Sequence, residues 1–205
     1  MPLPNIDVAQ LLIQFSILLI SLTVHEAAHA WTADRLGDAT ARRLGRVSLN
    51  PAVHIDPIGT IVFPLIAIVT NLPLIGWAKP VPVSVVQLRE HWRQKFMLIA
   101  AAGPASNLVL AGVAAVLIRI AGAGQVGAVL ETAIFVNVLL AVFNMIPIPP
   151  LDGGNVLAGL LTGPMADAFD RLRPFGFIIL YALMLTGMLT TLISPPASFL
   201  LSWLL

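Results

Sequence analysis

The chain has 205 residues, of which 58% are hydrophobic and only 10% are charged, and its formal net charge at pH 7 is +1. Soluble domains carry about 25% charged residues, so this composition excludes an ordinary soluble domain and indicates a polytopic membrane protein. The lack of cysteine excludes disulfides and thiolate metal sites, and the lack of a basic run gives no sign of a nucleic-acid partner. We therefore expect a single all-α integral membrane domain over residues 1–205.

The first apolar stretch predicts a transmembrane helix over residues 7–36. Asn5 or Asp7 can cap its beginning, and Gly37 suits the position that follows a helix end. At 1.5 Å per residue this helix is about 45 Å long, which exceeds the hydrocarbon layer of a bilayer. Its last turns, around Arg35, therefore project from the membrane.

The inner half of this helix contains the sequence His25-Glu26-Ala27-Ala28-His29. Histidines four residues apart lie on the same face of a helix, where each can bind one zinc ion through a ring nitrogen. Glu26 lies beside the first histidine, where a carboxylate can act as general base on the attacking water. The motif also occurs by chance on soluble helices. Here it follows an uncharged run from Val8 to Val24, and ionisable groups inside a membrane are functional by default.

The region 56–83 contains an apolar stretch, residues 58–78, that is interrupted by helix-breaking or polar residues: Pro64, Asn71, Pro73 and Gly76. A single membrane crossing here would place the cations that follow it on the side opposite to Arg35. We instead expect a re-entrant or hairpin excursion, which returns these cations to the side of Arg35.

Three further spans are predicted, over residues 96–120, 126–148 and 174–193. The prolines Pro195-Pro196 are expected to end the last span and to leave a tail too short to cross. The expected architecture is therefore a core of three helices, an excursion between the first two, and one further C-terminal helix.

In this topology every Lys and Arg except Arg119 faces the cytoplasm, as the positive-inside rule requires. The protein is then a multi-pass protein of the cell membrane with its N-terminus outside. His25 and His29 lie inside the membrane, nearer to the cytoplasmic face.

A catalytic zinc takes three protein ligands and keeps one position open. His54 and His91 are candidates for the third ligand, but both lie in polar connections beside charged residues. Asp152 is the better candidate, because its span returns to the cytoplasmic side and the prolines before it end the helix. Gly153 and Gly154 then permit a tight turn close to the metal. The alternative is that Asp152 is only a turn residue, since Asp-Gly is a common turn pair.

Together these motifs resemble the site-2 proteases (peptidase family M50), which are intramembrane zinc metalloproteases. His25-Glu26-x-x-His29 matches their first motif, and Asn144-x-x-Pro147-x-x-Pro150-Leu151-Asp152-Gly153 matches the second. Gly103-Pro104-x-x-Asn107 matches a recurring element of the middle helix. The resemblance implies hydrolysis of peptide bonds within the bilayer, with a transmembrane segment of another protein as substrate.

The resemblance also implies roles for single residues. His25, His29 and Asp152 would bind one zinc ion, and Glu26 would act as the base. Asn144 would position the substrate or stabilise the oxyanion, unless its amide only bonds neighbouring backbone. The residues expected to brace the site or hold the substrate are Gly103, Pro104 and Asn107.

Two segments bear on how a substrate is selected. Residues 76–83 would be the extended segment that receives the substrate as an added strand, or else an ordinary proline-rich loop. His54 would support the metal ligands from just before the excursion, or else is a loop histidine. The sequence has no room for the PDZ or CBS domains of many relatives. We therefore expect a compact form, in which the membrane core or a separate regulator or adaptor selects the substrate.

Two other functions remain alternatives on the sequence alone. A divalent-metal transporter would use the same residues as a transient site, and it would need polar residues along a path across the membrane. The sequence has few of these: Gln10, Gln14, Ser16 and Asn137. A catalytically inactive binding partner would not need a complete set of metal ligands together with a base.

Overall fold

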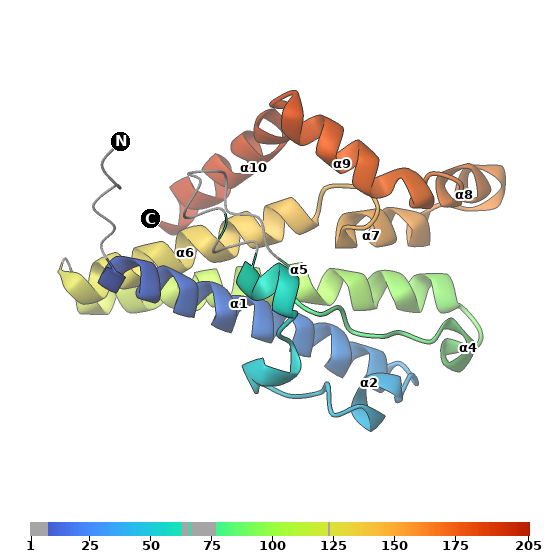
Figure 1. Cartoon of the computed structure of the whole chain (residues 1–205), viewed down its shortest axis with the longest axis horizontal. Helices are drawn as coiled ribbons and strands as arrows, with labels where there is room; N and C mark the ends of the chain where they lie inside the picture. The colour runs from blue at the N-terminus through green and yellow to red at the C-terminus, as the bar shows by residue number, and fades with distance from the viewer. Residues whose placement is uncertain (1–7, 63–65, 67–76, 123) are drawn as a thin grey trace.

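A computed structural model of the chain describes residues 8–62, 66, 77–122 and 124–205 (Figure 1). The expected helix caps Asn5 and Asp7 lie outside the described residues, as does the middle of the expected excursion. The described part is built of helices joined by short connections and contains no strand. This confirms the expected all-α class of a polytopic membrane protein.

Three helices are long and apolar enough to cross a membrane: α1 (Val8–Arg35), α5 (Trp92–Ala121) and α6 (Gln125–Asn144). They run along the long axis of the molecule, and α5 contacts both of the others (Figure 1). The third span was expected to reach residue 148 but ends at Asn144, because Pro147 has no N–H and disfavours helix in the residue before it. The three helices form the frame that holds the site.

Small side chains line the face of α5 that packs against α6 and α10 (Met188–Leu204). Ala111, Ala114 and Ala115 of α5 contact Ile134 and Val138 of α6 there. Lipid tails are as apolar as these side chains, so close backbone approach and dispersion, not exclusion of water, hold such helices together. The outward faces carry large exposed apolar side chains, as contact with lipid requires.

A group of short elements connects α1 to α5: α2 (Thr40–Arg43), η1 (Pro51–Val53), the π-helical turn η2 (Pro57–Val62), and α4 (Val85–Leu88). The described ends of the expected excursion lie side by side. The Trp77 N–H donates to the Gly59 carbonyl at 3.1 Å, and the Lys79 N–H donates to the His54 carbonyl at 2.8 Å. The stretch between Gly59 and Trp77 therefore begins and ends at the same place, although most of its residues lie outside those described.

The C-terminal part consists of α7 (Asp152–Leu160), α8 (Gly163–Asp170), η3 (Arg173–Phe175), α9 (Gly176–Leu185) and α10. The span expected over 174–193 is not straight, because the chain bends by 82° between the α8–α9 segment and α10. The bend lies at Gly187, whose φ of +74° suits glycine.

The expectation that Pro195-Pro196 ends the last span was wrong, because α10 runs through both prolines to Leu204. Proline has a φ that fits a helix, so each one removes only a hydrogen bond and perturbs the preceding turn. Ala197, directly after them, is buried against α5 and α6, and this packing holds the helix in place.

Candidate metal centre

The site is built where α1 and α5 cross one another antiparallel, with side chains meeting once per turn. His25 and His29 lie four residues apart on α1, and Ile99, Gly103 and Asn107 lie four residues apart on α5. Positions four apart share one face of a helix, so the two rows face each other. The register then sets His25 beside Asn107 and His29 beside Ile99.

Both histidines are oriented by hydrogen bonds from α5. His25 Nδ1 is 2.6 Å from Asn107 Oδ1, and His29 Nδ1 is 2.7 Å from the Ile99 carbonyl oxygen. Each partner atom is an acceptor, so each Nδ1 carries the proton and each Nε2 keeps a free lone pair. Both rings therefore present Nε2 as a ligand atom, the arrangement that metal-binding histidines use.

Gly103 lies directly under the two imidazole rings. A Cβ at this position would lie 2.3 Å from His29 Nε2 and 2.6 Å from His25 Cε1, so no larger residue fits. The next residue, Pro104, has no N–H and leaves the Ala100 carbonyl without its helical partner. The missing backbone hydrogen bond of α5 is therefore next to the Ile99 carbonyl, which accepts from His29.

Asp152 is the first residue of α7, and its side chain closes the site. Its Oδ2 lies 3.1 Å from His25 Nε2 and 3.3 Å from His29 Nε2, and the two Nε2 atoms are 3.0 Å apart. This oxygen is buried and has no hydrogen-bond donor among the described residues.

The glycines after Asp152 have a different role from the tight turn expected. Gly153 and Gly154 belong to the first turn of α7, which packs against the backbone that precedes it. A Cβ on Gly153 would lie 2.3 Å from the Met145 carbonyl oxygen, and one on Gly154 would lie 2.6 Å from the Pro149 nitrogen. The glycines therefore let the helix start close enough to α6 for Asp152 to reach the histidines.

The donor set fits a zinc ion. Two imidazole lone pairs and a carboxylate oxygen meet at 3.0 to 3.3 Å with both Nδ1 protons directed elsewhere, so they repel one another unless a cation lies between them. Bonds of about 2.0 to 2.1 Å to a tetrahedral zinc place ligand atoms about 3.3 Å apart. Within the described residues this is the one group of three or more potential ligands.

Glu26 lies next to His25 and is buried, with 9% of its surface exposed. Its Oε2 accepts a hydrogen bond from the Val81 N–H at 3.1 Å. Val81 belongs to the extended segment Trp77–Val83, so this segment runs along the base of the site. No sequence pattern indicated a contact between Val81 and Glu26.

Arg46 fixes that segment, although the sequence suggested only a cation that marks the cytoplasmic face. It is 6% exposed, and its guanidinium donates to the carbonyls of Val53, Lys79 and Pro80, the last two at 2.5 and 3.1 Å. A buried charge is costly unless it is hydrogen-bonded, and here backbone carbonyls that accept from both terminal nitrogens replace an acidic partner, while Nε has no partner among the described residues. Arg46 thus ties the connection after α2 to the segment that contacts Glu26.

Asn107 is fully buried and is held from a second side by Asn137 of α6. Asn107 Nδ2 donates to Asn137 Oδ1 at 2.9 Å and to the Ser21 carbonyl at 3.3 Å. From the sequence, Asn137 was expected only as one of the few polar residues of a transport path. An asparagine in an apolar span needs a polar partner, and this was the signal for a link to the site.

Two residues predicted for the site have other contacts. Asn144 is half-buried, and its Nδ2 donates to the Leu140 carbonyl of its own helix at 3.0 Å. His54 is 2% exposed, and its Nε2 lies 2.8 Å from the Ser48 carbonyl. No hydrogen bond among the described residues joins either side chain to His25, His29 or Asp152.

Comparison with known proteins identifies the family. The profile of peptidase family M50 matches residues 118–186. The chain is 35% identical over 179 residues to "Putative zinc metalloprotease YwhC" of Bacillus subtilis, with 82% of this chain and 78% of the relative covered.

It is also 36% identical over 175 residues to "Putative zinc metalloprotease Rip2" of Mycolicibacterium smegmatis, and 29% identical over 171 residues to Rip2 of Mycobacterium tuberculosis. The matches cover 64% of each Rip2 chain, and no solved structure matches. These relatives do not favour a divalent-metal transporter. The chain belongs to peptidase family M50, the site-2 protease family, and is an intramembrane zinc metalloprotease.

Proposed function

We propose that His25, His29 and Asp152 hold the catalytic zinc of this protease, and that Glu26 is the general base and acid. The reaction is hydrolysis of a peptide bond in a transmembrane segment of a membrane-protein substrate. One observation carries the proposal: three acceptor atoms from α1 and α7 converge within 3.0 to 3.3 Å, with both histidine protons turned away.

Zinc supplies Lewis-acid chemistry, since it lowers the pKa of water to about 7 and polarises a carbonyl group. The Glu26 carboxylate accepts the proton of the attacking water and returns it to the amide nitrogen when the C–N bond breaks. The Val81 N–H holds Glu26 Oε2 in place, so the carboxylate is oriented before the substrate arrives.

Asn144 is proposed to donate to the oxyanion that forms at the attacked carbonyl. Its amide now bonds the Leu140 carbonyl of its own helix, so this role requires the side chain to turn when substrate binds. Asn107 and Gly103 act on the ligands instead, since they contact the histidine rings.

The segment Trp77–Val83 is proposed to lie along the substrate. The N–H groups of Trp77, Lys79 and Val81 point to one side and are already bonded to the Gly59 and His54 carbonyls and to Glu26. Pro80 and Pro82 have no N–H, so the opposite edge is poor in donors. A substrate strand on that edge would therefore bind chiefly by donating its own N–H groups to carbonyls.

The proposed orientation places the N-terminus outside and the metal centre toward the cytoplasm. Arg35, Arg42 and Arg43 cluster at the end of α1 nearer the histidines, and Arg119 lies near the opposite end of the bundle, at the end of α5. Such an excess of cations marks the cytoplasmic side of a membrane protein. Substrate selection is proposed to come from the membrane core or from a separate regulator or adaptor.

The test is a Glu26→Gln variant that is purified in detergent and compared with the wild type. It should keep one zinc ion per chain and lose cleavage by about 10²- to 10⁴-fold, because only proton transfer is removed. Crosslinking in membranes should trap intact single-span proteins on this variant, and these should be cut by the wild type. Glu131→Gln on α6 is the matched control, since Glu131 is exposed and remote from the site. Undiminished cleavage by Glu26→Gln contradicts the proposal.

A further inference from the structure

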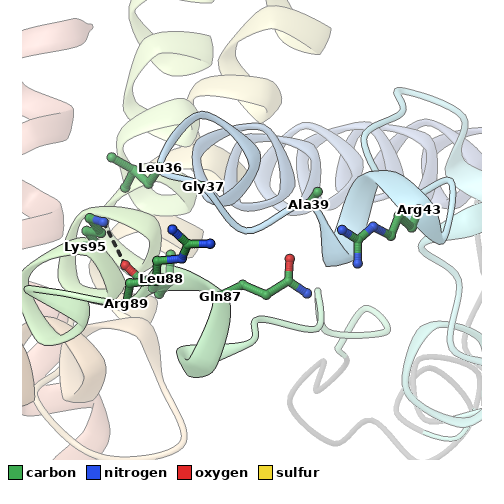
Figure 2. Close-up of a pocket in the computed structure, with 8 residues that line it drawn as sticks. All are labelled: Leu36, Gly37, Ala39, Arg43, Gln87, Leu88, Arg89 and Lys95. Atoms are coloured by element: carbon green, nitrogen blue, oxygen red, sulfur yellow. Dashed lines mark hydrogen bonds between the residues drawn. The ribbon is translucent and has the colours of Figure 1, made fainter.

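A cavity of about 420 Å³ lies beyond the end of α1, between α2, α4 and the start of α5 (Figure 2). Its lining combines the apolar side chains of Leu36 and Leu88 with three cations, Arg43, Arg89 and Lys95. No acidic residue is among the described residues that line it. The volume is within the range of small-molecule sites.

The cations of this cavity have donors to spare. Neither Arg43 nor Arg89 uses its guanidinium in a hydrogen bond or ion pair with any described residue. Lys95 Nζ donates to the Leu88 carbonyl at 2.7 Å and keeps two further N–H groups. Figure 2 shows the two guanidinium groups on opposite sides of Gln87, one from α2 and the other from the end of α4, and both residues line the cavity.

No described carboxylate forms an ion pair with Arg43, Arg89 or Lys95. Asp34 is paired with Arg42. Asp38 is fully buried, and its two oxygens accept from Thr40 and from the Ser84 N–H. The three cations of the cavity therefore remain available to pair with an anionic ligand.

The backbone at Arg89 is held in an unusual conformation. Its φ is +57°, a region that residues with a side chain rarely adopt, and His91 two residues later has a φ of +58°. Strain of this kind persists where the surrounding structure enforces it, often at binding sites. Here Arg89 follows this turn, lines the cavity and is itself exposed.

The helix ends beside the cavity carry residues that are typical of a membrane surface. The cavity begins where α1 ends and where α5 starts, and both ends carry an arginine stacked on a tryptophan. Arg35 lies 5.0 Å from the Trp31 ring and Arg93 lies 4.8 Å from the Trp92 ring. Tryptophan and arginine at helix ends are typical of the interface between lipid and water.

We propose that this cavity binds a phosphate group, from the headgroup of an anionic phospholipid or from a soluble phosphate ester. Arginine matches phosphate with two parallel N–H donors, and basic pockets beside membrane helices bind anionic headgroups. Arg43 and Arg89 bind the phosphate from two sides, Lys95 adds a third charge, and Leu36 contacts the apolar part of the ligand. The site is independent of zinc; the proposed orientation decides only that the cytoplasmic leaflet supplies the lipid.

The test measures binding of three probes to the full chain in detergent: dihexanoyl phosphatidic acid, dihexanoyl phosphatidylcholine and glycerol 3-phosphate. The wild type should bind phosphatidic acid at least about tenfold more tightly than phosphatidylcholine, because only the former is a net anion. Weaker binding of glycerol 3-phosphate than of phosphatidic acid identifies a lipid as the source. Equal binding of the two identifies a soluble phosphate ester.

The double variant Arg43→Gln/Arg89→Gln should lose at least about tenfold in affinity for the tighter probe, whereas Arg43→Lys/Arg89→Lys should keep part of it. Arg119→Gln/Arg171→Gln is the control, since it removes two exposed arginines elsewhere and should bind as the wild type. Zinc content of each variant shows that it is folded. The proposal is overturned if the wild type binds none of the probes, does not discriminate phosphatidylcholine, or binds no better than the glutamine variant.

Discussion

The two faces of α5 hold their neighbours in different ways. Toward α1, Ile99 and Asn107 bond the histidines at hydrogen-bond distances, and Gly103 leaves the space that the imidazole rings occupy. Toward α6 and α10, alanines such as Ala111 and Ala115 pack against apolar side chains without directional contacts. On one face of α5 the contacts depend on the exact positions of single atoms, and on the other face they depend only on the size of the side chains.

The difference follows from the interactions available inside a membrane. Dispersion between apolar side chains is weak per atom and tolerates small shifts, so similar side chains can replace one another. A hydrogen bond or a ligand geometry fails when an atom moves by an ångström. Substitutions on the first face should therefore abolish function, whereas substitutions on the second should cost only stability.

Gly103→Ala should have the largest effect of these substitutions. The added methyl would lie within 2.6 Å of both imidazole rings and push them apart, and a displacement of about 1 Å costs about 100-fold in rate. Cleavage of a substrate recovered by trapping measures this effect. Gly112→Ala on the same helix meets open space and is the control. Equal activity of the two variants would contradict the proposed packing.

Asn107→Ala should have an intermediate effect. Without the Asn107 oxygen, the His25 ring loses the partner that fixes its proton on Nδ1, and zinc affinity should fall about 10- to 100-fold. Competition with a chelator of known affinity measures the change. Ser106→Ala, the preceding residue, removes a hydroxyl that bonds only within α5 and should leave zinc affinity unchanged.

Ile134→Val should have the smallest effect. Ile134 is fully buried against α5, and loss of one methylene there should lower the free energy of unfolding by about 1 kcal/mol. Thermal unfolding in detergent measures this change. Activity should stay within about twofold of the wild type, because no ligand contact is altered. A loss of zinc with this variant would show that the two faces are coupled.

Several features of the protein follow from local sequence. The lengths of apolar runs predict the three long helices, because crossing a bilayer needs about 20 apolar residues. The spacing of His25 and His29 places both on one face of α1, because a helix repeats every 3.6 residues. The motif from Asn144 to Gly153 indicated Asp152 as the third ligand, and the structure places this carboxylate beside both histidines.

Other features were decided only by tertiary structure. Asn107 and His25 are 82 residues apart, and Val81 and Glu26 are 55 apart, so their contacts depend on how the helices and the extended segment are registered. The burial of Arg46 likewise depends on two connections meeting around it. The hydrophobic periodicity of the sequence does not predict such contacts. They depend on how separate helices and loops are placed against one another, and not on the sequence of any one of them.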